Sequence, residues 1–180
     1  DVTNFFSNFS APCDLMYREP AGAERVLFDC NTTSTDEASC AAMDPSVSYD
    51  GKTIIFSVFR GKLVHPSENI HPQVLDPLAT NTDYTRFTFP NRILQTKEAQ
   101  LHIVNVATGD VKALPHVADT IDAGPTFLPD GRITFTSTRE AQRRAMVAGT
   151  NNAGPTAQLW TADPDGRNAD LASHHGLGGD

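Results

Sequence analysis

A unit of sequence that occurs twice constrains the fold of this chain more than any other feature. Residues 45–57 contain two strand-like runs on either side of an Asp50-Gly51 turn, and residues 125–136 repeat this order around Asp130-Gly131. In both copies a proline comes first, and a basic residue followed by a β-branched and aromatic run comes after the turn. Glycine accepts the positive φ that a tight hairpin requires, so each copy predicts a β-hairpin.

The second half of the unit repeats as well. Gln100-Leu101-His102 returns as Gln158-Leu159-Trp160, and each is followed by a glycine-containing turn and a short return strand. One unit therefore contains four strands, which is the make-up of a propeller blade. Residues 25–30 look like the second strand of an earlier, incomplete copy. We predict an all-β fold, a partial β-propeller with about two to three four-stranded blades and long loop insertions.

The repeats also predict how the chain is organised. An N-terminal extended segment is expected over 1–24, and the blades are expected over 25–180. The two repeat cores are 44–60 with 100–116 and 123–139 with 158–174, and the insertions are 61–99 and 140–157. A short helix is expected over 138–147. Because propellers close with about 4–8 blades, we expect that the chain belongs to a longer polypeptide or that other copies supply further blades.

The charge and the cysteine content indicate which partners and which cellular compartment to expect. The net charge of −8 argues against a nucleic-acid surface, which needs clustered Lys and Arg. No segment approaches the ~20 apolar residues of a membrane span. The polar segment between Cys30 and Cys40 favours a disulfide between these two residues, with a Cys13–Cys30 bridge or three free thiols as the alternatives. A disulfide is typical of oxidising compartments, so we expect a periplasmic or secreted protein.

Two phrases of the repeat resemble a known family. Residues 48–52 and 128–139 resemble the TolB-type, or WD40-like (PD40), propeller repeat. The longer phrase, together with residues 159–166 and the Ser173-His174-His175 run, looks most like the propeller domain of hydrazine synthase alpha-subunit-like proteins. This resemblance covers roughly residues 25–180 and implies an exported bacterial protein. Chemistry in that family depends on haem, and this sequence has no Cys-x-x-Cys-His run, so haem would have to come from another part or subunit.

The first insertion contains a candidate metal site. His65, Glu68 and His71 lie close together in the sequence, and imidazole and carboxylate are standard ligands of divalent metals. A proline follows each histidine and biases it to an extended backbone, which stiffens the loop. The alternative is a polar loop on the propeller whose histidines bind backbone groups.

A second set of histidines lies near the connections between blades. His116 and the pair His174-His175 each follow the return strand of a unit. Histidines at this place could line the axial channel and bind a ligand there, or they could simply cap the turn between blades.

Two arginines occupy matching places in the repeat. Arg60 and Arg139 align at the end of the second strand of each unit, and we expect structural pairs with a neighbouring acidic turn or with Asp119 and Asp122. The alternating apolar positions predict the core. Its expected members are Val47, Ile54, Phe56, Leu101, Ile103, Phe127, Ile133, Phe135, Leu159 and Trp160.

The sequence supports a binding function better than a catalytic one. It has no Gly-x-Ser-x-Gly elbow, no Gly-x-Gly-x-x-Gly run and no phosphate loop, so no catalytic residue is assigned. Insertions in repeat proteins lie on one face and often bind. The first hypothesis is an exported propeller module that binds a ligand or a protein, such as a cytochrome subunit or further copies of itself. The alternatives are a segment of a hydrazine-synthase-like multihaem or metal-dependent redox enzyme, and a hydrolase or lyase with a histidine-bound metal.

Overall fold

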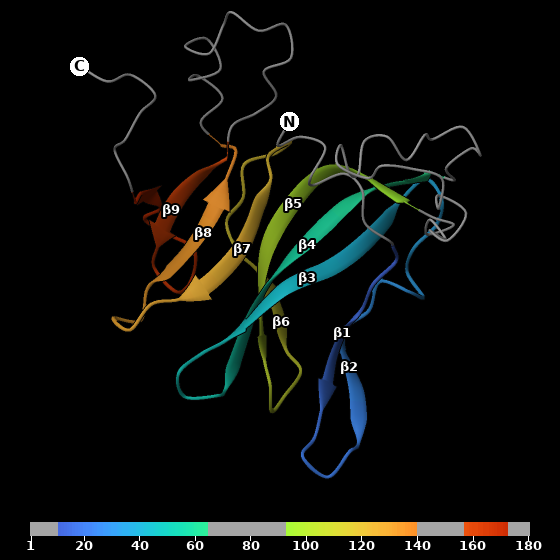
Figure 1. Ribbon diagram of the computed structural model, residues 1–180, viewed down its shortest axis with the longest axis horizontal. Coiled ribbons are helices and arrows are strands. Elements are labelled where there is room, and N and C mark those ends of the chain that lie inside the picture. Colours follow the sequence, from blue (N-terminus) through green and yellow to red (C-terminus); the bar gives the residue numbers. More distant parts are fainter. Residues whose placement is uncertain (1–10, 65–92, 140–156, 173–180) are drawn as a thin grey trace, which may run out of the picture.

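The described strands of this protein form two four-stranded sheets that lie next to each other, and a two-stranded hairpin (Figure 1). The computed structural model describes residues 11–64, 93–139 and 157–172, and these contain strands but no helix. The strands are β1 (Leu15–Arg18), β2 (Glu24–Phe28), β3 (Ser39–Val47), β4 (Thr53–Val64), β5 (Ile93–Asn105), β6 (Val111–Ala113), β7 (Asp122–Phe127), β8 (Ile133–Ser137), β9 (Gln158–Ala162) and β10 (Asp170–Leu171).

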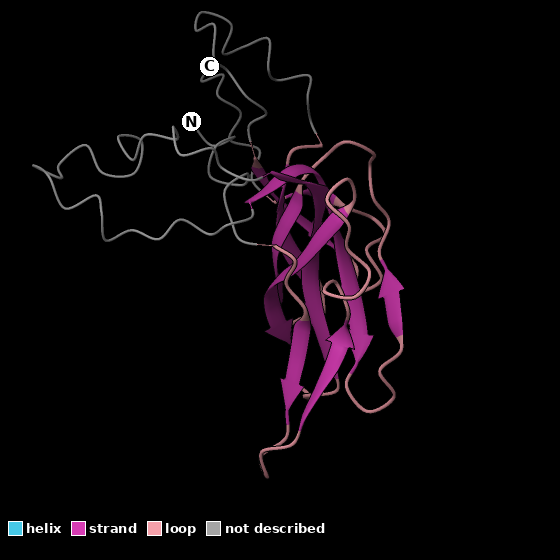
Figure 2. Ribbon diagram, turned by 90° about the vertical axis from the view of Figure 1, so that its right-hand side faces the viewer, coloured by secondary structure: helices cyan, strands magenta, loops and turns pink. Residues whose placement is uncertain are grey.

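Each large sheet is a simple antiparallel meander. One has the order β3-β4-β5-β6, the other has the order β10-β9-β8-β7, and β1 and β2 form a separate hairpin. Four antiparallel strands that follow each other in the chain make up a propeller blade. The predicted all-β, partial propeller fold is therefore confirmed. Figure 2 shows that the strands run along one long direction, with loops at both ends.

The repeated Asp-Gly turns close the first hairpin of each sheet. The Asp50 carboxylate accepts hydrogen bonds from the Ser48 hydroxyl at 2.7 Å and from the Lys52 backbone at 3.1 Å. In the second copy, Asp130 accepts from the Arg132 backbone at 3.1 Å. Gly51 and Gly131 have φ values of 71° and 89°. A side chain is strained in this region, so glycine is required at both turns.

The apolar core has two layers, one on each face of the first sheet. Between the two large sheets, Ile55 and Leu101 pack with Ile133, Phe135 and Trp160. The other face is covered by the hairpin, and its buried residues include Leu15, Leu27, Phe56, Val58 and Val104. Burial of each large side chain contributes about 1.5–3 kcal/mol, so both layers stabilise the stack.

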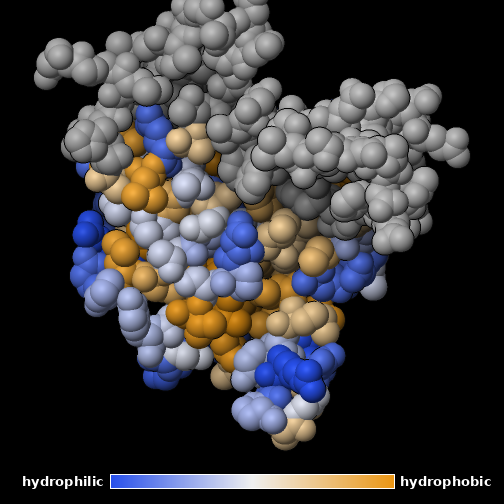
Figure 3. Space-filling model, viewed as in Figure 1, coloured by the Kyte–Doolittle hydropathy of each residue, from blue (hydrophilic) through white to orange (hydrophobic). Residues whose placement is uncertain are grey.

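Two residues of the expected core are exposed. Val47 is 57% exposed and Leu159 is 45% exposed. Successive side chains of a strand point to opposite faces, so Leu159 points away from the first sheet because Trp160 points toward it. Val47 is the last residue of β3, next to the Asp-Gly turn. The space-filling view likewise shows hydrophobic residues on the surface of the described part (Figure 3).

The predicted disulfide between Cys30 and Cys40 is confirmed. Their Cα atoms are 5.4 Å apart and both residues are buried, whereas Cys13 is a free, exposed cysteine. The bridge holds the segment between the hairpin and β3. We name this segment, residues 30–40, the disulfide loop.

Two further expectations concern helices. The helix expected over 138–147 lies outside the described residues, except for Thr138 and Arg139, which follow β8 without regular secondary structure. Within the described ranges, no helix has the length and apolar character to cross a bilayer.

Candidate functional site

Both insertions leave the sheets at the same edge. β4 ends at Val64 and β5 begins at Ile93, while β8 ends at Ser137 and β9 begins at Gln158. Because neighbouring strands are antiparallel, these four ends lie together, opposite the Asp-Gly turns (Figure 1). We name this end of the two sheets the insertion edge.

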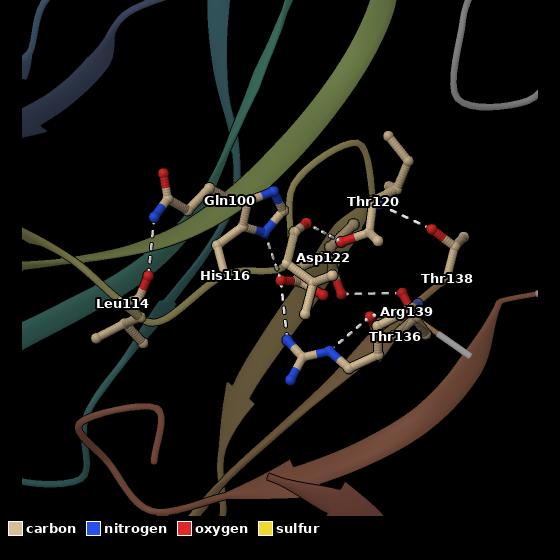
Figure 4. Close-up of polar contacts among 12 residues, drawn as sticks. Gln100, Leu114, His116, Thr120, Asp122, Thr136, Thr138 and Arg139 are labelled. Atoms are coloured by element: carbon tan, nitrogen blue, oxygen red, sulfur yellow. Dashed lines mark hydrogen bonds and ion pairs between the residues drawn. The ribbon is translucent and has the colours of Figure 1, made fainter. Parts of the chain in front are cut away.

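A buried carboxylate at the insertion edge binds an arginine and a histidine side chain. Asp122 is the first residue of β7, and its Oδ2 accepts hydrogen bonds from His116 Nδ1 and from Arg139 Nη2, both at 2.9 Å (Figure 4). The side chains of Asp122, His116 and Arg139 are only 1%, 10% and 13% exposed. Through the two hydrogen bonds of this cluster, Asp122 links the segment before β7, which contains His116, to the residue Arg139 just after β8.

Arg139 is held from several sides. Its backbone N–H and its Nε both donate to the Ser137 hydroxyl, at 3.1 and 3.0 Å. The guanidinium lies 5.0 Å from the ring centre of Phe135 and 5.2 Å from that of Trp160. Cation–π contacts of this kind strengthen when the cation is shielded from water. The guanidinium is therefore fixed in one position by its own sheet.

The electrostatics keep Asp122 ionised. Burial alone raises the pKa of its carboxyl, but the hydrogen bonds to His116 and Ser137 and the charge of Arg139 outweigh burial and lower it. Burial is also the main reason why the pKa of His102 is lowered, and the charges of Arg60 and His116 lower it further against the Gln100 backbone contact. Asp122 and Arg139 thus form a buried ion pair.

Two buried polar atoms of the cluster are not used in its hydrogen bonds. Within the described ranges, His116 Nε2 and Asp122 Oδ1 are buried without a hydrogen-bond partner. Glu98 Oε2 lies 3.8 Å from His116 Nε2, and the Glu98 side chain is partly exposed. The histidine thus links the buried Asp122 to a carboxylate at the surface.

A charged hollow opens beside this cluster. It has a volume of about 370 Å³ and lies between the disulfide loop and the strand ends at Arg60–Lys62 and Lys97–Glu98. Lys62 forms an ion pair with Glu37 across the hollow, and Lys97 forms one with Asp119 at 3.3 Å. Glu98 belongs to both the hollow and the surroundings of His116, so the two features are adjacent.

Most of the predicted site histidines cannot be placed. His65, Glu68 and His71, and also His174 and His175, lie outside the described residues, so the metal and channel sites stay predictions. In the part of the chain that the structure describes, no group of three or more His, Cys, Asp or Glu residues is arranged to hold a metal ion.

Three of the residues singled out in the sequence, His116, Arg139 and Arg60, lie in the described part of the chain, and their contacts are defined. His116 faces Asp122 and Glu98, so its position in the connection between blades was predicted but its buried partner was not. Arg139 forms the expected pair with Asp122. Arg60 is exposed and makes no such pair with another described residue. The sequence signal for the His116 contact is Asp122, an acidic residue that begins β7 and is buried.

Comparisons with known proteins add little to this description. No protein-family model matches the sequence, and no curated protein matches it. Among solved structures, the chain is similar to the crystal structure of Porphyromonas gingivalis dipeptidyl peptidase 4, with 14% sequence identity and a TM-score of 0.46. The match covers 84% of this chain and 21% of that one, so the chain spans about a fifth of that protein's length.

Proposed function

We propose that this chain is an exported propeller segment that binds a ligand or protein partner at its insertion edge. One observation carries the proposal: the four strand ends that the insertions connect, the charged hollow and the buried ion-pair cluster all lie at this edge. Among the described residues, the opposite edge has short Asp-Gly and related turns. Loops displayed on a rigid sheet scaffold are the usual place for binding residues.

The setting of the proposal is an oxidising compartment. The buried Cys30–Cys40 disulfide supports it, because such bonds persist in the periplasm and in secreted proteins. In this proposal the blades extend over 25–180, and the partner is a protein such as a cytochrome subunit or a further copy of the chain.

The test compares binding at the two edges. In one variant, an Asn-Gly turn replaces residues 65–92 and joins β4 directly to β5. In the control variant, Tyr49→Ala removes an exposed aromatic side chain at the opposite edge. Partners are captured from the exported proteins of the source cell, identified by mass spectrometry, and purified for binding measurements.

The proposal expects that the shortened variant loses binding of the purified partner while its thermal unfolding stays that of a folded protein. Tyr49→Ala should bind like the parent chain. Equal binding by all three proteins would overturn the proposal. A Soret absorption band or a stoichiometric metal ion in the purified chain would instead favour the redox enzyme alternative, with His65, Glu68 and His71 as the first ligands to replace.

A further inference from the structure

The two sheets repeat each other closely enough to compare single positions. Phe56 pairs across the sheet with His102, and Phe135 pairs with Trp160 in the same way. Arg60 and Arg139 each lie four residues after their phenylalanine. The two arginines therefore occupy equivalent positions at the insertion edge, one in each blade.

The carboxylate that neutralises the second arginine is missing from the first sheet. In the second sheet, Ser137 pairs with Asp122, which binds Arg139. The residue equivalent to Ser137 in the first sheet is Val58, which pairs with Ala42. An alanine thus stands where the repeat has its buried aspartate. Consistent with this, the Arg60 side chain has no ion pair or hydrogen bond with any other described residue.

Arg60 instead lines the hollow beside the disulfide loop. The cationic residues of this hollow are Arg60, Lys62 and Lys97. Lys62 is paired with Glu37 and Lys97 with Asp119. Arg60 stands opposite Glu98 in the β4–β5 register, but the two side chains form no ion pair, so the guanidinium keeps its hydrogen-bond donors available. A planar guanidinium binds a carboxylate through two parallel hydrogen bonds, which makes it the favoured residue for this anion.

The wall opposite Arg60 is well fixed. The disulfide loop is held by the Cys30–Cys40 bond, and the Asp14 carboxylate accepts hydrogen bonds from the backbone N–H groups of Cys30 and Asn31, at 2.7 and 2.8 Å. Ser34 and Thr33 of this loop add hydroxyl groups to the lining. A fixed wall lowers the entropy cost of binding a small group in the hollow.

We propose that the hollow binds a carboxylate group of the ligand or partner, with Arg60 as its main contact. The bound carboxylate takes the part that Asp122 plays for Arg139 in the neighbouring blade. This inference deepens the proposed function and rests on it, because the hollow lies at the insertion edge. In a chain with a net charge of −8, an arginine that has no ion pair among the described residues favours the binding of an anion at its own position.

The test is a titration of the full, isotope-labelled chain with succinate, followed by NMR. The backbone amides of Gly61 and Lys62 and the Arg60 Nε–H report on the hollow. We expect saturable shifts at these groups, and at least about tenfold weaker binding in Arg60→Gln, which loses the charged bidentate contact. Arg132→Gln is the matched control, because Arg132 lies at the opposite edge and is paired with Asp130 at 2.8 Å.

Three results would overturn the inference. They are no saturable shift in the parent chain, equal succinate binding by Arg60→Gln, and tighter binding of inorganic phosphate than of succinate. Because succinate is tested without any partner, its failure to bind leaves the partner measurements above unaffected, and the two proposals can fail separately.

Discussion

At the scale of single residues, one carboxylate organises the insertion edge. Asp122 is almost fully buried, and its Oδ2 holds both His116, from the connection between the sheets, and Arg139, from the end of β8. Removing one partner of a buried ion pair lowers the stability of a protein by more than the pair contributes to it. The reason is that the remaining charge stays buried without a partner of opposite charge.

We therefore expect Asp122→Ala to lower the free energy of unfolding by about 3–5 kcal/mol, measured by urea denaturation. Glu24→Ala is the control, since it removes an exposed ion pair with Arg18 at 3.8 Å and should change stability by about 1 kcal/mol or less. Similar, small effects in both variants would show that the buried cluster does not hold the edge together.

The buried His102 predicts a dependence of stability on pH. Its pKa is lowered in the folded protein, chiefly by burial, so the unfolded chain binds more protons below about pH 6.5. The free energy of unfolding should therefore fall as the pH drops from about 7 to about 5.

His102→Phe should remove this part of the pH dependence, as measured by urea denaturation across the same range. The ring fits, because His102 already lies 5.4 Å from the ring of Phe28 and 5.7 Å from that of Phe56, and the second sheet has Trp160 at the equivalent place. An unchanged slope in the variant would assign the titration to another group.

The sequence predicted some of these residue contacts and missed others for a physical reason. The alignment of Arg139 with Arg60 and the nearby Asp119 and Asp122 led to the correct ion pair of Arg139. Arg60 lacks such a carboxylate because Ala42 stands opposite Val58, where the second sheet has Asp122 opposite Ser137. Contacts that depend on cross-strand register do not show in a linear pattern.

At the scale of elements, the disulfide loop is the best-defined irregular segment. Cys30 and Cys40 are separated by 10 positions, and the chain-entropy model assigns about 3 kcal/mol to closing a loop of this size. We expect the Cys30→Ser/Cys40→Ser variant to lose about this amount of unfolding free energy, compared in a Cys13→Ser background that excludes thiol exchange. A loss well below about 1 kcal/mol would mean that the loop is held by its hydrogen bonds instead.

The long β4–β5 pair contains an irregular step at Gly61. The pairing register shifts between Arg60 and Gly61, and a Cβ at Gly61 would collide with the backbone carbonyl of Gln95. Gly61→Ala should therefore destabilise the protein by about 1–3 kcal/mol in thermal or chemical unfolding. Lys62→Ala, its neighbour, loses only an exposed ion pair and should stay within about 1 kcal/mol. If the two variants unfold alike, the close approach at Gly61 is absent in solution.

The sequence predicted the order of the strands in both sheets, but it did not predict the irregularity in their pairing register. The Asp-Gly turns and apolar runs led to the correct hairpins, because turn chemistry and strand alternation are local properties. The bulge at Gly61 was missed, since a register shift changes neither the turn residues nor the alternation around it.

At the scale of the whole molecule, the two meanders pack face to face as neighbouring propeller blades. The layer between them combines Ile55 and Leu101 from the first sheet with Phe135 and Trp160 from the second. Alternation predicted that Phe135 and Trp160 are buried, but it also placed Leu159 in the core. Which face of a sheet is covered depends on neighbours that a local pattern does not contain.

The most direct test of this claim uses Trp160, the single tryptophan of the chain. Its indole protons should show nuclear Overhauser contacts with the methyl groups of Leu101 and Ile55, which belong to the other sheet. We expect these contacts in the NMR spectrum of the full chain, and we expect them to persist in Arg60→Gln, which alters only the hollow. Contacts of Trp160 only within its own sheet would show that the two sheets are not stacked as blades.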